Sequence, residues 1–60
     1  MTREEAIRIL DPETSAEALA EIEYYAGFHG GAAVVKAVND ACILAVAALR
    51  AQAQREKEAK

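Results

Sequence analysis

The fold is decided by the run Ala41-Cys42-Ile43-Leu44-Ala45-Val46-Ala47-Ala48-Leu49, in which no side chain is polar. The run lies in a segment without glycine or proline from Ala32 to Lys60, which predicts one long helix. A helix that is apolar on all sides needs neighbours on more than one side. A chain of 60 residues offers little cover, so we expect this helix to pack against a second copy or another protein.

The size of the chain limits how it can be stabilised. Domains this small are marginal unless a disulfide, a metal or oligomerisation helps. Cys42 is the only cysteine and is expected to be a small buried hydrophobe, while His29 is the only histidine, so no metal or cofactor is expected. Since the apolar run is far shorter than the roughly 20 residues of a membrane span and no signal peptide is recognisable, a cytoplasmic protein that does not bind membranes is expected. Self-association or a partner remains as the stabilising contact.

The remaining sequence predicts an all-α domain over residues 1–60, with helices at about 3–10, 13–26 and 32–56 and a tail at 53–60 that can fray. Thr2 and Glu5 form a capping-box pattern at the first helix, which Pro12 ends. The second helix can start with Asp11 as its cap or with Thr14 as its cap and Glu17 in a second capping box.

The expected core positions follow helical spacing. The first two helices carry apolar stripes at Ala6, Ile7, Leu10, Ser15, Ala18, Leu19, Ile22, Tyr25 and Ala26. Gly27 is the expected stop of the second helix, with Phe28 packing back on the core. The pair Gly30-Gly31 is expected to give the freedom to reverse direction before the last helix.

The long helix has more apolar surface than one contact can use. Its broad core face is predicted at Val34, Val38, Ala41, Ala45, Ala48, Leu49 and Gln52. Further apolar residues lie on the flanks of that face, and Ile43 lies among polar residues on the far side. We therefore expect an intertwined or side-by-side homodimer, with candidate interface residues Val35, Val38, Cys42, Ile43, Val46 and Leu49.

Charge is unevenly distributed along the chain. Five acidic residues and no basic ones lie between Asp11 and Glu23, whereas Arg50, Arg55, Lys57 and Lys60 lie near the C-terminus. An acidic face disfavours nucleic acid and suits a basic protein surface, although it can also be a solvated face that keeps the protein soluble. The candidate partner-binding residues are Glu13, Glu17, Glu21 and Tyr24.

No group of residues predicts catalysis. His29 has no nucleophile or second histidine at motif spacing, and Gly27-Phe28-His29-Gly30-Gly31 has neither the preceding strand nor the following Lys-Ser/Thr of a phosphate-binding loop. Glu17 and Glu21 form a helical pair without a second set of metal ligands. We therefore expect a protein that is not an enzyme.

The opening Met1-Thr2-Arg3-Glu4-Glu5-Ala6-Ile7, followed by a short helix and an acidic second one, resembles that of many small helical cytoplasmic proteins of Firmicutes bacteria and their phages. Very short phage proteins of this kind include inhibitors of bacterial immunity, among them the anti-Hachiman class, which is similar in size. The resemblance implies a phage or prophage-encoded homodimeric inhibitor of a host protein that defends the bacterial cell. The alternative is a small helical regulatory or nucleic-acid-associated dimer that uses the basic C-terminal residues.

Overall fold

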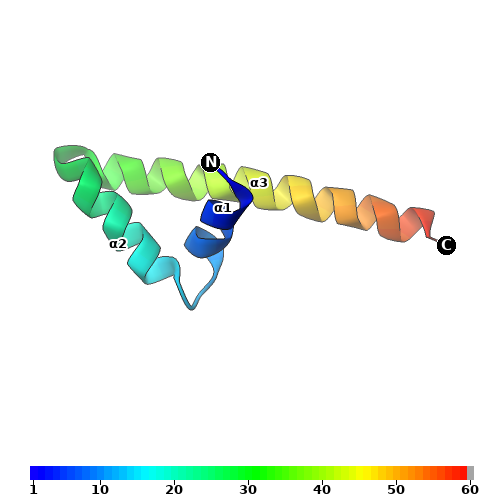
Figure 1. Cartoon of the computed structure of the whole chain (residues 1–60). Coiled ribbons are helices and arrows are strands. Elements are labelled where there is room, and N and C mark those ends of the chain that lie inside the picture. The colour runs from blue at the N-terminus through cyan, green and yellow to red at the C-terminus, as the bar shows by residue number, and fades with distance from the viewer. Residues whose placement is uncertain (60) are drawn as a thin grey trace.

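The computed structural model describes residues 1–59 and confirms the all-α class. Helix α1 spans Arg3–Leu10, α2 spans Ser15–Ala26, the short 3-10 helix η1 spans Gly27–His29, and α3 spans Gly30–Glu58. The chain is thus helical without a break over 44 residues, Ser15–Glu58, but it reverses direction between α2 and α3 (Figure 1). Compared with the sequence-based bounds, α2 begins two residues later and α3 two residues earlier.

The start of α1 matches the predicted cap. The side chain of Thr2 accepts a hydrogen bond from the Glu5 N–H at 3.1 Å, which satisfies one of the free donors of the first turn. After α1, the Asp11 side chain accepts a hydrogen bond from the Glu13 N–H at 2.9 Å and so shapes the turn at Pro12. Thr14 is the N-cap residue of α2, as one of the two predicted starts had it, but the second capping box is wrong, because the Thr14 hydroxyl donates to the Arg8 carbonyl at 2.7 Å and makes no cap bond to α2.

The reversal between α2 and α3 depends on two glycines with different tasks. Gly27 is the C-cap of α2 and has φ +59°, a conformation that side chains rarely adopt. Gly30 is already helical, and a Cβ there would lie 2.8 Å from the Glu23 carbonyl oxygen. Gly30 therefore permits close approach of α2 and α3 rather than supplying flexibility. The prediction that Phe28 packs back on the core is wrong, since its side chain is fully exposed at 101%.

The core is small and consists mainly of alanine. Its buried residues are Ala6, Ile9, Ala18 and Ala41, with Leu19, Ile22, Ala37, Val38 and Leu44 packed around them. In α1 the buried large residue is Ile9, whereas the predicted core residues Ile7 and Leu10 are exposed. The predicted core position Tyr25 is also exposed.

The long helix extends beyond the two helices that cover it. α1 lies across the middle of α3 and α2 slants away from the N-terminal end of α3, whereas the C-terminal half projects into open space (Figure 1). The predicted core face of α3 is correct from Val34 to Ala45, but Ala48, Leu49 and Gln52 are exposed, and Ala48 lies at the edge of the part of α3 that α1 approaches. We call the part of α3 from Ala48 to Glu58 the overhang.

The resulting shape is extended for so short a chain. The molecule measures 51 × 20 × 14 Å, and its radius of gyration of 14.1 Å exceeds the roughly 10 Å expected of a compact 60-residue domain. Its accessible surface is 4944 Å², whereas a compact monomer of this mass exposes about 3,800 Å². The difference, roughly 1,200 Å², reflects the extended shape of the molecule.

Candidate interaction surface

The predicted dimer-interface residues lie on one exposed side of α3, apart from Val38. Val38 is half-buried because it packs against the chain's own core, so little of its side chain is free for the predicted interface. The other five form what we call the α3 strip: Val35, Cys42, Ile43, Val46 and Leu49. The large apolar side chains in the α3 strip are between 43% and 70% exposed. The expectation of a buried Cys42 is wrong, because its thiol lies on this exposed side.

Two hollows lie beside this part of α3. The first, of about 390 Å³, is formed by Cys42, Ile43, Val46, Ala47 and Arg50, and so overlaps the α3 strip. The second, of about 420 Å³, separates α1 from α3 and is lined chiefly by Ile7, Leu10, Leu44, Ala45 and Ala48. Ile7 and Leu10, which the sequence assigned to the core, are therefore the α1 wall of an apolar groove that opens towards the overhang.

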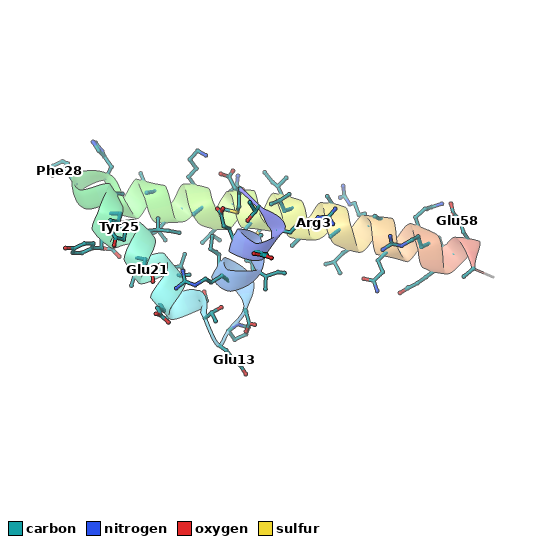
Figure 2. The ribbon with its side chains drawn as sticks, in the orientation of Figure 1. Arg3, Glu13, Glu21, Tyr25, Phe28 and Glu58 are labelled. Carbon is teal, nitrogen blue, oxygen red and sulfur yellow. The ribbon has the colours of Figure 1, made fainter. Side chains whose placement is uncertain are left out.

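A second exposed apolar group lies where α2 turns into α3. Tyr24 and Tyr25 are 80% and 83% exposed, and their rings meet edge to face with centroids 5.3 Å apart. The rings of Phe28 and His29 form a similar pair at 5.8 Å. Figure 2 shows Tyr25 and Phe28 pointing away from the body of the molecule. We call these four residues the aromatic end. Sequence reasoning selected only Tyr24 from this group, although the other aromatic residues lie within one helical turn of it.

The acidic residues proposed for partner binding are only partly available. Arg8 donates two hydrogen bonds to Glu21, each 2.9 Å long, and approaches Glu17 at 3.9 Å. The bidentate hydrogen bonds with Arg8 lower the pKa of Glu21 and raise that of Arg8. Glu13 lies at the exposed turn before α2 (Figure 2). Because Glu21 already has a basic partner within the chain, a basic surface would have to displace Arg8 to reach it.

The chain contains a helix that meets the length and composition of a membrane span. Within Ser15–Glu58, an 18-residue window has a mean hydropathy of 1.8 and is only 6% buried. The argument that the apolar run is too short to span a membrane is therefore wrong. It counted only the residues from Ala41 to Leu49, which have no polar side chain among them, whereas the apolar part of the helix is longer. Lys36 and Asp40, the only Lys, Arg, Asp or Glu residues between His29 and Arg50, form an ion pair of 2.8 Å one turn apart. Hydrogen bonding to Asp40 raises the pKa of Lys36.

Metal-ligating side chains are not clustered in the part of the chain that the structure describes. Among residues 1–59, no three His, Cys, Asp or Glu side chains lie close enough to hold a metal ion. The His29 ring meets that of Phe28 edge to face at the aromatic end, thirteen residues before Cys42 in the chain.

Comparison with known proteins adds no relative. No protein-family model, curated protein or solved structure matches the chain. The functional interpretation accordingly depends on the geometry of the α3 strip, the groove and the aromatic end.

Proposed function

We propose that this chain is a non-enzymatic interaction protein that forms a homodimer and binds another protein, as a small inhibitor or adaptor does. The observation that carries the proposal is the exposed apolar surface of α3, on which Val35, Ile43 and Leu49 are each at least 60% exposed. Contiguous apolar surface of this kind marks contact sites in soluble proteins. The resemblance of the opening residues to short phage and bacterial proteins favours a cytoplasmic inhibitor of a host defence protein.

The area of exposed surface is sufficient for a dimer. A stable interface buries about 800 Å² on each partner, and this chain exposes roughly 1,200 Å² more than a compact monomer. Burial of apolar surface stabilises by about 25 cal/mol for each Å² removed from water. A small chain whose core holds one buried large side chain, Ile9, gains most from such a contact.

The two exposed apolar groups suit different tasks. The α3 strip is long and aliphatic, as in helix pairs that associate with their own kind. The aromatic end is compact and projects from the molecule, and tyrosine is enriched among the residues that dominate binding between proteins. We assign the α3 strip to self-association, and the aromatic end, together with Glu13 and Glu17 at the other end of α2, to the host protein.

The experiment that tests the proposal measures mass in solution by light scattering between 1 and roughly 100 μM, a range in which weak dimers with Kd values near micromolar dissociate. We expect a dimer for the wild-type chain and a monomer for Ile43→Asp, because the carboxylate would be desolvated in the interface. Ala51→Asp is the control, since it adds the same charge at an exposed α3 position outside the α3 strip. A wild-type monomer throughout this range would overturn the proposal, as would equal dissociation by both variants.

The alternative function of the same apolar segment of α3 is to span a membrane. Asn39 and the ion pair of Lys36 with Asp40 lie within it, and charged side chains in a bilayer are costly. These residues support a helix that stays in water. Sedimentation with lipid vesicles therefore accompanies the mass measurement, and we expect the protein to remain in the supernatant without detergent. Pelleting with vesicles would favour insertion of α3 into a membrane.

The nucleic-acid alternative has less support. Residues 11–23 carry five acidic side chains, and the chain has a net charge of −3. Nucleic acid requires a basic footprint, which only Arg50, Arg55 and the residues near the C-terminus could supply. Lys60, one of the four basic residues of this alternative, lies outside the described residues.

A further inference from the structure

We infer that the aromatic end binds an arginine-bearing segment of the partner protein, with the exposed carboxylate of Glu23 as the counter-charge. The inference rests on the proposed function, which assigns the aromatic end to a host protein, and it adds the chemistry of the side chain that is recognised there. Three observations support it: the exposure of the aromatic rings, the lack of basic residues between Arg8 and Lys36, and the position of Glu23.

The rings of the aromatic end are accessible to a ligand. Tyr24, Tyr25 and Phe28 are 80%, 83% and 101% exposed, and Figure 2 shows Tyr25 and Phe28 pointing away from the body of the molecule. The face of an aromatic ring attracts a cation that lies within about 6 Å of the ring centroid. An arginine guanidinium is planar and stacks on such a face, whereas a lysine ammonium is compact and more strongly hydrated. The exposed rings therefore favour arginine over lysine.

The segment that forms the aromatic end is acidic. Between Arg8 and Lys36 the chain has five acidic residues and no Lys or Arg. The two basic residues that bound this segment already have partners within the chain, since Arg8 pairs with Glu21 and Lys36 pairs with Asp40. Complementary charge favours a basic occupant, and an acidic one would be repelled.

Glu23 is the acidic residue at the aromatic end. It directly precedes Tyr24, it is exposed, and it forms no ion pair among residues 1–59. A Cβ at Gly30 would lie 2.7 Å from the Glu23 Cγ, so the Glu23 side chain lies against the first turn of α3, where α2 and α3 meet. Glu21, in contrast, is held by Arg8. The carboxylate of Glu23 is therefore the one that can accept hydrogen bonds from an arginine stacked on a neighbouring ring.

The α3 strip does not suit a basic segment. Its side chains are aliphatic apart from the thiol of Cys42, and Arg50 lines the hollow beside it. Arg55 and Lys57 follow on the overhang. Because like charges repel, an arginine-bearing segment is directed to the α2 end of the molecule.

The test measures the binding of labelled peptides by fluorescence anisotropy at about 50 mM salt, where surface charges are weakly screened. The probe is a short peptide of alternating arginine and glycine, and three matched peptides carry lysine, glutamate or leucine in place of arginine. We expect the arginine peptide to bind most tightly, and to bind several-fold more weakly at about 500 mM salt. A lysine or leucine peptide that binds as tightly as the arginine peptide would overturn the inference.

Variants locate the contact, after circular dichroism has established that each is as helical as the wild-type chain. Glu23→Gln and Tyr24→Leu should each weaken binding of the arginine peptide about two- to five-fold, the size expected of one exposed ion pair or cation–π contact. Tyr24→Phe keeps the ring and should bind nearly as well as wild type. Glu4→Gln is the matched control, because it removes the same charge from an exposed position of α1. An equal loss for Glu4→Gln and Glu23→Gln would mean attraction to the net charge alone, and would overturn the site.

Light scattering and capture from a bacterial lysate, made on the same samples, separate this inference from the proposed function. A dimeric chain that captures a host protein but shows no preference for the arginine peptide would overturn the inference and leave the proposed function standing. A monomeric chain that captures no protein would overturn the proposed function itself.

Discussion

Arg8 of α1 and Glu21 of α2 are joined by two hydrogen bonds of 2.9 Å, a planar pairing that ties the two short helices together. The Thr14 hydroxyl reinforces the same connection by its bond to the Arg8 carbonyl. Both short helices also pack on α3, so the ion pair closes a three-helix arrangement whose core contains few large side chains. It also explains why the acidic side of α2 carries less free charge than its sequence indicates.

The ion pair predicts a pH dependence of stability. The pKa of Glu21 is lowered by Arg8 from its ordinary value of 4.5, so the folded state holds the ionised form more strongly than the unfolded state does. The contribution is complete above the unfolded pKa and is lost as pH falls through the lowered folded pKa. We therefore expect Glu21→Gln to melt a few degrees below wild type at pH 7, with a difference that narrows as the pH falls through the lowered folded pKa, measured by circular dichroism at one concentration.

Glu4→Gln is the matched control, since Glu4 is exposed on α1 and forms no ion pair among residues 1–59. Its melting temperature should follow that of wild type much more closely across the same pH range. A Glu21→Gln difference that does not narrow as the pH is lowered from 4.5, or one shared equally by Glu4→Gln, would contradict the assignment to Arg8.

Gly30 and Gly31 predict opposite responses to the same substitution. A Cβ at position 30 would lie 2.8 Å from the Glu23 carbonyl oxygen and 2.7 Å from its Cγ, whereas nothing lies within 4 Å of one at position 31. We expect Gly30→Ala to destabilise by about 1–3 kcal/mol through overpacking. Gly31→Ala should stabilise by up to about 1 kcal/mol, because alanine favours the helix. Equal effects in urea denaturation would show that α2 and α3 do not approach so closely.

Much of the secondary structure could be predicted from the sequence, because its signals are local. Thr2, Pro12 and Gly27 act through the backbone within a few residues, and each acts near its expected position. The start of α2 was less certain, since Thr14 fits both a cap and a bond to a preceding helix. The Thr14 hydroxyl bonds to the Arg8 carbonyl of α1 because the fold brings that carbonyl within reach, and this position cannot be predicted from the local sequence.

Which apolar side chains are exposed depends on how far α1 and α2 extend along α3. The helical periodicity of the sequence does not give that length. Leu49 has the same helical phase as core positions of α3, yet it is exposed because α1 and α2 end their cover before it. Phe28 is hydrophobic enough for a core, but the backbone at Gly27 directs the turn outward. Most of the α3 strip is exposed because its residues lie on the side of α3 away from the short covering helices, and its role as an interface stays a prediction.

Ile9 and Ile7 provide a matched pair for the core. Both are in α1, but Ile9 is 5% exposed and Ile7 is 62% exposed on the wall of the groove. Ile9→Ala should cost about 2–5 kcal/mol through the lost burial and the cavity, which is enough to unfold so small a domain at 37 °C. Ile7→Ala should cost less than about 1 kcal/mol. A larger loss for Ile7→Ala in urea denaturation would mean that the α1 face is assigned incorrectly.

The aromatic end predicts a separation of binding from stability. Tyr24→Ser with Phe28→Ser replaces two side chains that are 80% and 101% exposed, so each change should alter the free energy of unfolding by less than about 0.5 kcal/mol. The same pair should remove capture of a host protein that the wild-type chain retains from a bacterial lysate, because exposed aromatics dominate such contacts. Ala16→Ser with Ala20→Ser is the control on exposed α2 positions away from the turn. Light scattering should find both double variants dimeric, since neither changes a residue of the α3 strip. If the Tyr24 and Phe28 variant still captures the host protein, the aromatic end is not the partner site.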